Sequence, residues 1–175
     1  LEQEASKKTH PDYNIKAIAI LDSIIKINNR SNAYKLALER KESISTKSIN
    51  IQLQKYSYSN ENTRALIRYK NTDSLKISFY KINQKQLKQF NNSYNEKNNL
   101  TDSITKNTQP IITKNYPLEN RNDYFEYSTE VLLPNLKTGS YLVCFESESD
   151  TKDKKAFAFE TITISNISVL GSQNE

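Results

Sequence analysis

The segment Leu133–Phe145, LPNLKTGSYLVCF, decides the fold class, because it joins two runs of strand-forming residues through a closely specified turn. Pro134 has no backbone N–H to give to a neighbouring strand, so the strand before it must end there. Gly139 supplies a backbone conformation that other residues resist, and Leu136 is expected to tuck into the end of the core. Beyond the turn, alternate residues return on one face, and these are Tyr141, Val143 and Phe145. The segment therefore predicts a strand, a turn with a buried leucine, and a second strand, with Leu142 and Cys144 pointing the other way.

Alternation of apolar and polar residues recurs through residues 48–169. In 48–56, for example, Ile49, Ile51 and Leu53 fall on one face of an extended chain. Seven such strands are predicted, and no helix is expected to connect them in the βαβ manner: 48–56, 62–70, 74–82, 110–118, 123–133, 139–145 and 155–170. Because nearly every strand has one apolar face, each sheet should bury one side and expose the other. The fold class predicted is mainly β, a seven-stranded antiparallel β-sandwich.

A helical hairpin is predicted before the strands, over residues 11–47, after a polar tail at 1–10. In its first helix an apolar stripe recurs at helical spacing, comprising Ala17, Ile18, Leu21, Ile24 and Ile25. Ile20 and Ile27 widen this stripe, which indicates packing against more than one neighbour. The hairpin is similar to one unit of a helical repeat, but one unit does not establish an array.

Ser31 is placed to cap the second helix of the hairpin. The residues predicted to share one face of this helix are Ala33, Leu36, Ala37 and Ile44. Between the strands, the Asn-rich residues 84–108 break the alternation and are predicted to form a long insertion or mobile loop. A helical turn is expected there around Leu87 and Phe90.

Composition excludes several classes of protein. The net charge is +5, but basic residues alternate with acidic ones along most of the chain, which argues against a nucleic-acid site. The single cysteine excludes an intrachain disulfide, and no apolar run reaches the ~20 residues of a membrane helix. The chain starts at Leu1 and contains no Met, so it is expected to be a processed product or an excised piece.

No catalytic, cofactor-binding or metal-binding residues are predicted. His10, the one histidine, lies in the polar tail, away from any nucleophile in the predicted fold. An internal thioester needs a C-x-E-Q sequence, whereas Cys144-Phe145-Glu146 is followed here by Ser147. Four acids near one loop, Glu146, Glu148, Asp150 and Asp153, are interpreted as a solvated hairpin tip and not as a calcium site. The chain is predicted not to be an enzyme.

Two segments resemble the bacterial α2-macroglobulin family. Residues 65–82, ALIRYKNTDSLKISFYKI, are similar to a strand, turn and strand of that family. The opening segment is similar to its L-P-x-L-x-x-G-x-Y-x-V motif, matched by Leu133, Pro134, Leu136, Gly139, Tyr141 and Val143. These six residues are predicted to form a structural corner. Sandwich domains of the fibronectin type use a related L-P-x-x-x-Y corner, so the fold that the resemblance implies is fibronectin- or macroglobulin-like.

The resemblance implies a non-catalytic framework domain of a cell-envelope or periplasmic protein. In the family, macroglobulin-like domains surround a bait segment and a thioester domain and trap proteases, and the parent protein is often lipid-anchored. This chain carries neither the thioester nor an evident bait, so its implied partners are neighbouring domains of the same polypeptide, and proteases only through the whole protein. Residues 170–175 are then a tail leading to the next domain. No nucleic-acid partner, cofactor or membrane insertion by this chain is implied.

A stand-alone binding module is the alternative, a surface β-sandwich that holds a peptide or a glycan. Such a module should expose one contiguous apolar or aromatic patch. A framework domain should instead carry contact surfaces at both ends, toward both neighbours.

Overall fold

A computed structural model describes residues 7, 9–27, 31–59, 61–92, 95–147 and 155–167. Two helices come first, α2 (Tyr13–Ile27) and α3 (Asn32–Ser45), and two more, α4 (Gln84–Asn92) and α5 (Lys97–Asn107), lie between strands. The strands are β1 (Ser48–Leu53), β2 (Tyr56–Ser57), β3 (Arg64–Lys70), β4 (Ser74–Ile82), β5 (Ile112–Pro117), β6 (Glu126–Leu132), β7 (Gly139–Ser147) and β8 (Phe157–Ile164).

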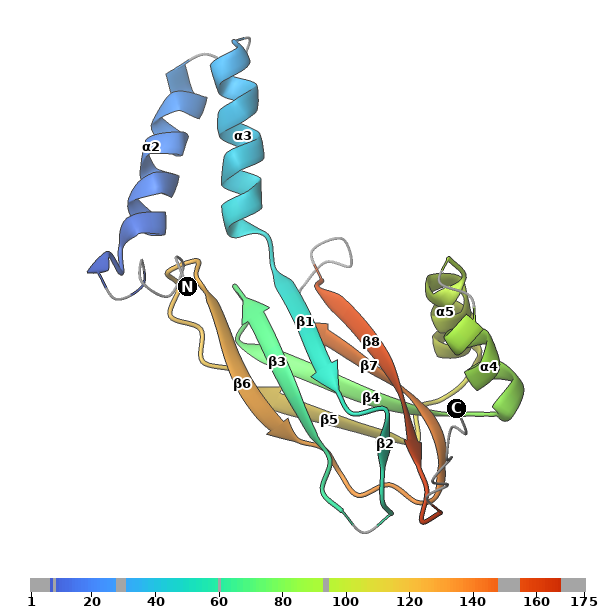
Figure 1. The fold of residues 1–175 in the computed structure, drawn as a ribbon. Coiled ribbons are helices and arrows are strands. Elements are labelled where there is room, and N and C mark those ends of the chain that lie inside the picture. The colour runs from blue at the N-terminus through green and yellow to red at the C-terminus, as the bar shows by residue number, and fades with distance from the viewer. Residues whose placement is uncertain are drawn as a thin grey trace, which may run out of the picture.

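The strands form two sheets that face each other (Figure 1). One sheet has three strands in the order β1-β3-β6, and the other has five in the order β2-β8-β7-β4-β5. The long pairings are antiparallel, with Ile67 opposite Thr129 across β3 and β6, and Phe79 opposite Val143 across β4 and β7. The structure is therefore mainly β with two sheets, and the fold class predicted from alternation is confirmed at this level.

Apolar side chains from both sheets meet in one core between them. The buried members that the alternation predicted are Ala65, Ile67, Tyr69, Leu75, Ile77, Phe79, Tyr141, Val143 and Phe145, each at most 4% exposed. Ile49, Ile51 and Leu53 of β1 pack against this core from its edge. The period of two placed these side chains correctly, because a strand turns successive residues to opposite faces.

Two details of the predicted sandwich are wrong. The described residues contain eight strands and not seven, because residues 48–57 form β1 and then a separate two-residue strand, β2. β2 pairs in parallel with β8, Tyr56 lying opposite Thr163, so the five-stranded sheet is mixed and not purely antiparallel. A two-residue strand has no alternation of its own, so periodicity carries no signal for it.

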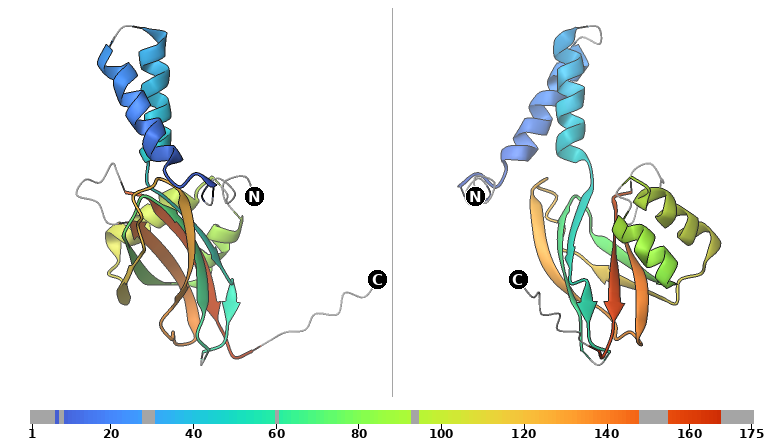
Figure 2. Two further views of the ribbon diagram at one scale, coloured as in Figure 1. Left: turned by 90° about the vertical axis from the view of Figure 1, so that its left-hand side faces the viewer. Right: turned by 45° about the vertical axis from the view of Figure 1, so that its right-hand side comes forward.

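Residues 84–108 are not a structureless insertion, because α4 and α5 form there and cover the outer face of the five-stranded sheet (Figure 2). Phe90 and Ile104 are buried in a second cluster with Leu142 and Cys144. The start of α4 carries a capping box, since Asn83 Oδ1 accepts from Gln86 N, and Gln86 Oε1 accepts from Asn83 N, both at 2.9 Å. β7 is consequently buried on both faces, where the sequence predicted one exposed face.

The helical hairpin projects away from the sandwich as an arm (Figures 1 and 2). Ser31 caps α3 as predicted, since its side chain accepts a hydrogen bond from Tyr34 N at 3.1 Å. α3 leads into β1 after two residues, so the arm and the sandwich are joined through Thr46 and Lys47.

Candidate interaction surfaces

The two residues that a catalytic site would need lie in different parts of the molecule. Cys144 is 1% exposed on β7, beneath α4 and α5, and burial raises the pKa of its thiol to about 12, with a smaller contribution from Glu146. His10 is exposed just before α2, its ring 6.4 Å from that of Tyr13. The structure does not bring this thiol and this imidazole together.

Only part of the acidic group near residue 150 falls within the described chain. Glu146 forms an ion pair with Lys155 at 3.9 Å, while Glu148, Asp150 and Asp153 lie outside the described residues. In the described parts of the chain no three His, Cys, Asp or Glu residues are grouped so that they could hold a metal ion. No described helix is long and apolar enough to cross a bilayer.

The six predicted corner residues lie together at the end of the sandwich core. Leu133, Leu136, Tyr141 and Val143 are buried members of that core, and Pro134 is half-buried between β6 and β7. Tyr141 Oη donates a hydrogen bond to the backbone carbonyl of Lys137, 2.7 Å away, and burial raises the pKa of this phenol. A tyrosine that bonds back to the backbone a few residues upstream forms the tyrosine corner of β-sandwiches.

Gly139 is required in this corner by its backbone. Its φ is +151°, a conformation that residues with a side chain rarely adopt. A Cβ at this position would meet Tyr141 Oη at 3.4 Å, an ordinary van der Waals contact, so backbone conformation and not lack of space selects glycine here. The corner residues are thus held by core packing, one hydrogen bond and one glycine conformation.

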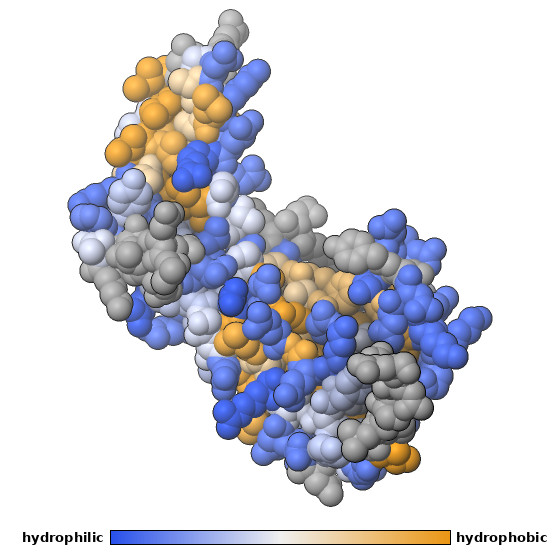
Figure 3. All heavy atoms as spheres, viewed as in Figure 1, coloured by the Kyte–Doolittle hydropathy of each residue, from blue (hydrophilic) through white to orange (hydrophobic). Residues whose placement is uncertain are grey.

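The largest group of exposed apolar side chains lies on the helical hairpin, where orange surface gathers over both helices in Figure 3. No residue of α2 is buried, although most of its residues are apolar. Six large side chains of the two helices are at least 40% exposed: Tyr13, Ile15, Ile20, Ile27, Leu36 and Leu38. Ile20 and Ile27, which the sequence predicted to meet a further neighbour, are 62% and 82% exposed.

Helix geometry places much of this surface on one side of the hairpin. Tyr13, Ile20 and Ile27 follow one another at seven-residue spacing and so form a line along α2. Leu21, one residue after Ile20, is half-buried in the contact between α2 and α3, which we call the seam. One residue corresponds to about 100° around a helix, so the line of Ile20 lies about 100° away from the seam. α3 runs antiparallel to α2, and its residue Leu36 comes directly before the buried Ala37, as Ile20 comes directly before Leu21. Because the two helices face each other and run in opposite directions, Leu36 lies on the same side of the hairpin as Ile20. We call the line and Leu36 the apolar face of the hairpin.

The face predicted for α3, with Ala33, Leu36, Ala37 and Ile44, is not buried as a whole. Ala37 is buried and Ile44 is half-buried, whereas Ala33 is exposed and Leu36 is 65% exposed. The residues turned toward α2 are instead spaced around Ala37, at Tyr34, Lys41 and Ile44. An ion pair between Asp22 and Lys41 joins the two helices beside this seam. Because Tyr34 and Lys41 are polar, the spacing of hydrophobic residues did not reveal that this side of α3 faces α2.

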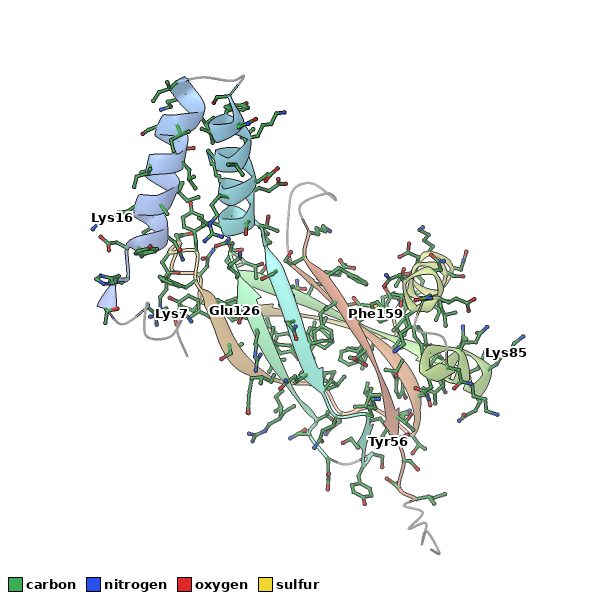
Figure 4. The ribbon with its side chains drawn as sticks, turned by 45° about the horizontal axis from the view of Figure 1, so that its top comes forward. Lys7, Lys16, Tyr56, Lys85, Glu126 and Phe159 are labelled. Atoms are coloured by element: carbon green, nitrogen blue, oxygen red, sulfur yellow. The ribbon has the colours of Figure 1, made fainter. Side chains whose placement is uncertain are left out.

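A second exposed apolar group lies at the opposite end of the sandwich, around β2 (Figure 4). Tyr56, Tyr58 and Ile167 are 73%, 48% and 79% exposed and line an open groove of about 670 Å³. Gln54, Ser57, Glu61 and Ser165 supply its polar lining. Sequence analysis missed this group because β2 is too short to be recognised, and because Ile167 was taken as part of a longer final strand.

Comparison with known proteins gives little beyond the fold. No protein-family model matches the chain, and no curated protein matches it. Among solved structures it is similar to the CARDB domain of a Pyrococcus furiosus protein, crystallised in complex with di-metal ions. The two chains are 10% identical, the match covers 68% of this chain and 87% of the other, and the TM-score is 0.35. The α2-macroglobulin family is not among these matches, so that resemblance remains a prediction from the sequence.

Proposed function

We propose that this chain is a non-catalytic framework domain of a larger cell-envelope protein of the α2-macroglobulin type, and that it contacts neighbouring domains of the same polypeptide. The observation that carries the proposal is the position of its exposed apolar surface. One group lies on the hairpin that precedes β1, and the other lies around Tyr56 and Ile167, where the chain leaves β8. A domain held between two neighbours needs a contact surface toward each of them.

The amount of exposed apolar surface supports contact with protein. If each of the four side chains of the apolar face exposes on the order of 100 Å², their total falls within the ~300–600 Å² of the largest patch on a typical soluble monomer, which is often a functional surface. α2 itself is apolar over about half of its circumference, which is typical of a helix with neighbours on more than one side. In the described part of the chain, α3 packs along one of those sides.

The coding sequence around this chain gives the first test. The proposal expects one reading frame of well over ~1,000 residues, since single domains do not grow to that size, with a C-x-E-Q sequence downstream. A frame that stops soon after the codon for Glu175 contradicts it.

The second test addresses the hairpin directly. The chain and the adjoining segments of the polypeptide are expressed separately, and their association is measured by sedimentation velocity. Ile20→Lys with Ile27→Lys should weaken association at least tenfold, because both charges fall on the apolar face. Ala19→Lys with Ser45→Lys is the matched control, since it adds two lysines to exposed positions of the hairpin, Ala19 about 100° around α2 from Ile20 and Ser45 on the opposite side of α3 from Leu36. Equal effects of the two pairs, or none from the first, contradict the proposal.

A stand-alone module that binds a peptide or glycan is the second candidate, and the groove around Tyr56 and Tyr58 favours it. Two exposed tyrosines beside the polar lining offer flat apolar faces together with hydrogen-bonding groups. Titration of peptide and glycan libraries against the native chain and Tyr56→Ala tests it. Saturable binding that is lost in Tyr56→Ala, without any association with adjoining segments, selects this candidate over the framework domain.

A further inference from the structure

Hydrogen bonds join the helical hairpin to the sandwich at two places, one at the end of α3 and one at the start of α2. At the end of α3, the Asn71 side-chain amide donates to the carbonyls of Ile44 and Thr46, at 3.0 and 3.2 Å. Lys70 Nζ adds a hydrogen bond of 2.8 Å to the Ser43 carbonyl. Asn71 is part of the turn between β3 and β4, so this turn holds the base of α3 through carbonyls that the helix itself leaves without partners.

The base of α2 rests on a different loop, residues 118–125 between β5 and β6. Asn14 Nδ2 donates to the Tyr124 carbonyl at 3.3 Å, a longer bond than those of Asn71. Lys7 Nζ donates to the Glu126 carbonyl and stands 4.4 Å from the centre of the Tyr127 ring (Figure 4). In these interactions Asn14 reaches the loop and Lys7 reaches the start of β6 through their side chains, whereas α3 is also joined to β1 by the chain.

Left-handed backbone coincides with these two loops. Three non-glycine residues with positive φ occur in the described chain, Asn71 at 55°, Asn122 at 55° and Tyr124 at 61°. Asn tolerates this conformation, but for a bulky residue such as Tyr124 it is strained and persists only where its surroundings hold it. One of these residues lies in the turn that holds α3, and the other two lie in the loop that holds α2.

We propose that the hairpin is a lever that pivots on Asn71 and is held at one angle by a second, releasable contact, which Asn14 makes with the loop 118–125 and Lys7 makes with the start of β6. The Asn71 contact persists because it is made by two hydrogen bonds beside the covalent connection to β1. The second contact releases more readily because side chains make it without a covalent connection nearby, and because the Asn14 bond is long and ends on a strained residue. When α2 leaves the loop, Tyr124 is free to return to an extended conformation, so the angle of the arm and the shape of this loop change together.

The device lets a partner on the apolar face of the hairpin act on the sandwich. None of the described side chains of the hairpin belongs to the large core between the sheets, so its movement leaves that core intact. Binding that draws α2 away from the sandwich would release the loop 118–125, and binding that presses it inward would hold the loop.

The angle of the hairpin is measured as a distance between spin labels on Lys35→Cys, near the outer end of α3, and Lys114→Cys, on β5, by pulsed electron resonance. Both positions are exposed, and Cys144 stays unlabelled because it is buried, which a stoichiometry of two labels verifies. The native chain should give one narrow distribution. Asn14→Asp keeps the shape of the side chain but removes the donor, and should add a second, displaced population. Asn71→Asp should broaden the whole distribution.

Asn115→Asp is the matched control, since it makes the same chemical change at an exposed position on β5, and it should leave the distribution native. Asn71→Gly, which keeps the left-handed backbone and removes the amide, replaces Asn71→Asp if the latter fails to fold. A broad distribution in the native chain overturns the proposal, because no angle is then held. Native distributions in the Asn14→Asp and Asn71→Asp variants overturn it as well, and so does equal broadening in the control.

Discussion

Tyr141 Oη donates its hydrogen bond to the carbonyl of Lys137, four residues earlier, and thereby ties the start of β7 to the turn that precedes it. Leu136, inside the turn, is 7% exposed and Tyr141 is 2% exposed, so the turn is anchored by one polar and one apolar contact. The two contacts can be tested separately.

Removal of the corner hydrogen bond should destabilise the protein. Tyr141→Phe removes the donor of this part-buried hydrogen bond to the Lys137 carbonyl, which should lower the free energy of unfolding by about 0.5–1.5 kcal/mol. Urea unfolding followed by circular dichroism measures this loss. Tyr56→Phe is the control, because Tyr56 is 73% exposed, and it should change stability by less than about 0.5 kcal/mol. Equal stability of the two variants would show that the corner bond contributes nothing.

Removal of the turn leucine should cost more. Leu136→Ala creates a cavity at the end of the core and should lower the free energy of unfolding by about 2–5 kcal/mol. Leu132→Ala is matched to it, since Leu132 lies four residues earlier and is 50% exposed. The urea midpoints of both variants decide the point. A Leu136→Ala variant as stable as Leu132→Ala would mean that the turn is not anchored in the core.

The cover that α4 and α5 place over the five-stranded sheet can be tested through the thiol beneath it. Phe90 is 3% exposed, shares a cluster with Cys144, and its ring lies 6.2 Å from that of Phe159. Phe90→Ala should therefore raise the rate at which Cys144 reacts with a chromogenic disulfide in native buffer by at least tenfold. Phe157→Ala, at a ring that is 43% exposed, should leave the rate almost unchanged. A fast reaction in the native chain would contradict the burial of this thiol.

Alkaline pH should destabilise the protein, first through Cys144. Burial raises the pKa of its thiol from 9.0 to about 12, and burial likewise raises the pKa of Tyr127 from 10.0 to about 12. Above about pH 9 the unfolded chain has released protons that the folded chain still holds, so the free energy of unfolding falls as pH rises toward 12. Urea midpoints between pH 8 and 11 measure this decline.

Cys144→Ala should flatten the part of this decline that begins near pH 9 and retain the part caused by tyrosines. A native midpoint that is constant up to pH 11 would show that these groups ionise equally in the folded and unfolded chains. An unchanged slope in Cys144→Ala would assign the whole decline to the tyrosines.

A larger side chain should destabilise the hairpin only where it falls in the contact between α2 and α3. Ala37 is 3% exposed between the two helices, so Ala37→Leu overpacks this contact, which costs about 1–3 kcal/mol. Ala33→Leu, at an exposed position one turn earlier, is the control and should be nearly neutral. Helical circular dichroism during thermal unfolding reports the difference, and an early helical loss in Ala33→Leu alone would reverse the assignment of the seam.

The sequence by itself determined the sandwich and its inner core. A strand has a strict period of two, so the alternation in β3, β4 and β7 placed Ile67, Phe79 and Val143 inside before any contact was known. Pro134 and Gly139 act through local backbone chemistry, which is why their turn was also predictable. The alternation of a strand and the chemistry of a turn both depend only on residues that are close together in the sequence.

Only the tertiary structure decided what lies on the outside of the sheets. α4 and α5 are rich in Asn and Lys and bury few side chains, so their packing over Cys144 depended on distant contacts that no local pattern contains. β2 exists because β8 lies beside it. The joint of the hairpin likewise comes from residues about 27 and 110 positions apart, Asn71 with Ile44 and Asn14 with Tyr124. Periodicity reports which face of an element is apolar, but the partner that covers that face is chosen by the folded chain as a whole.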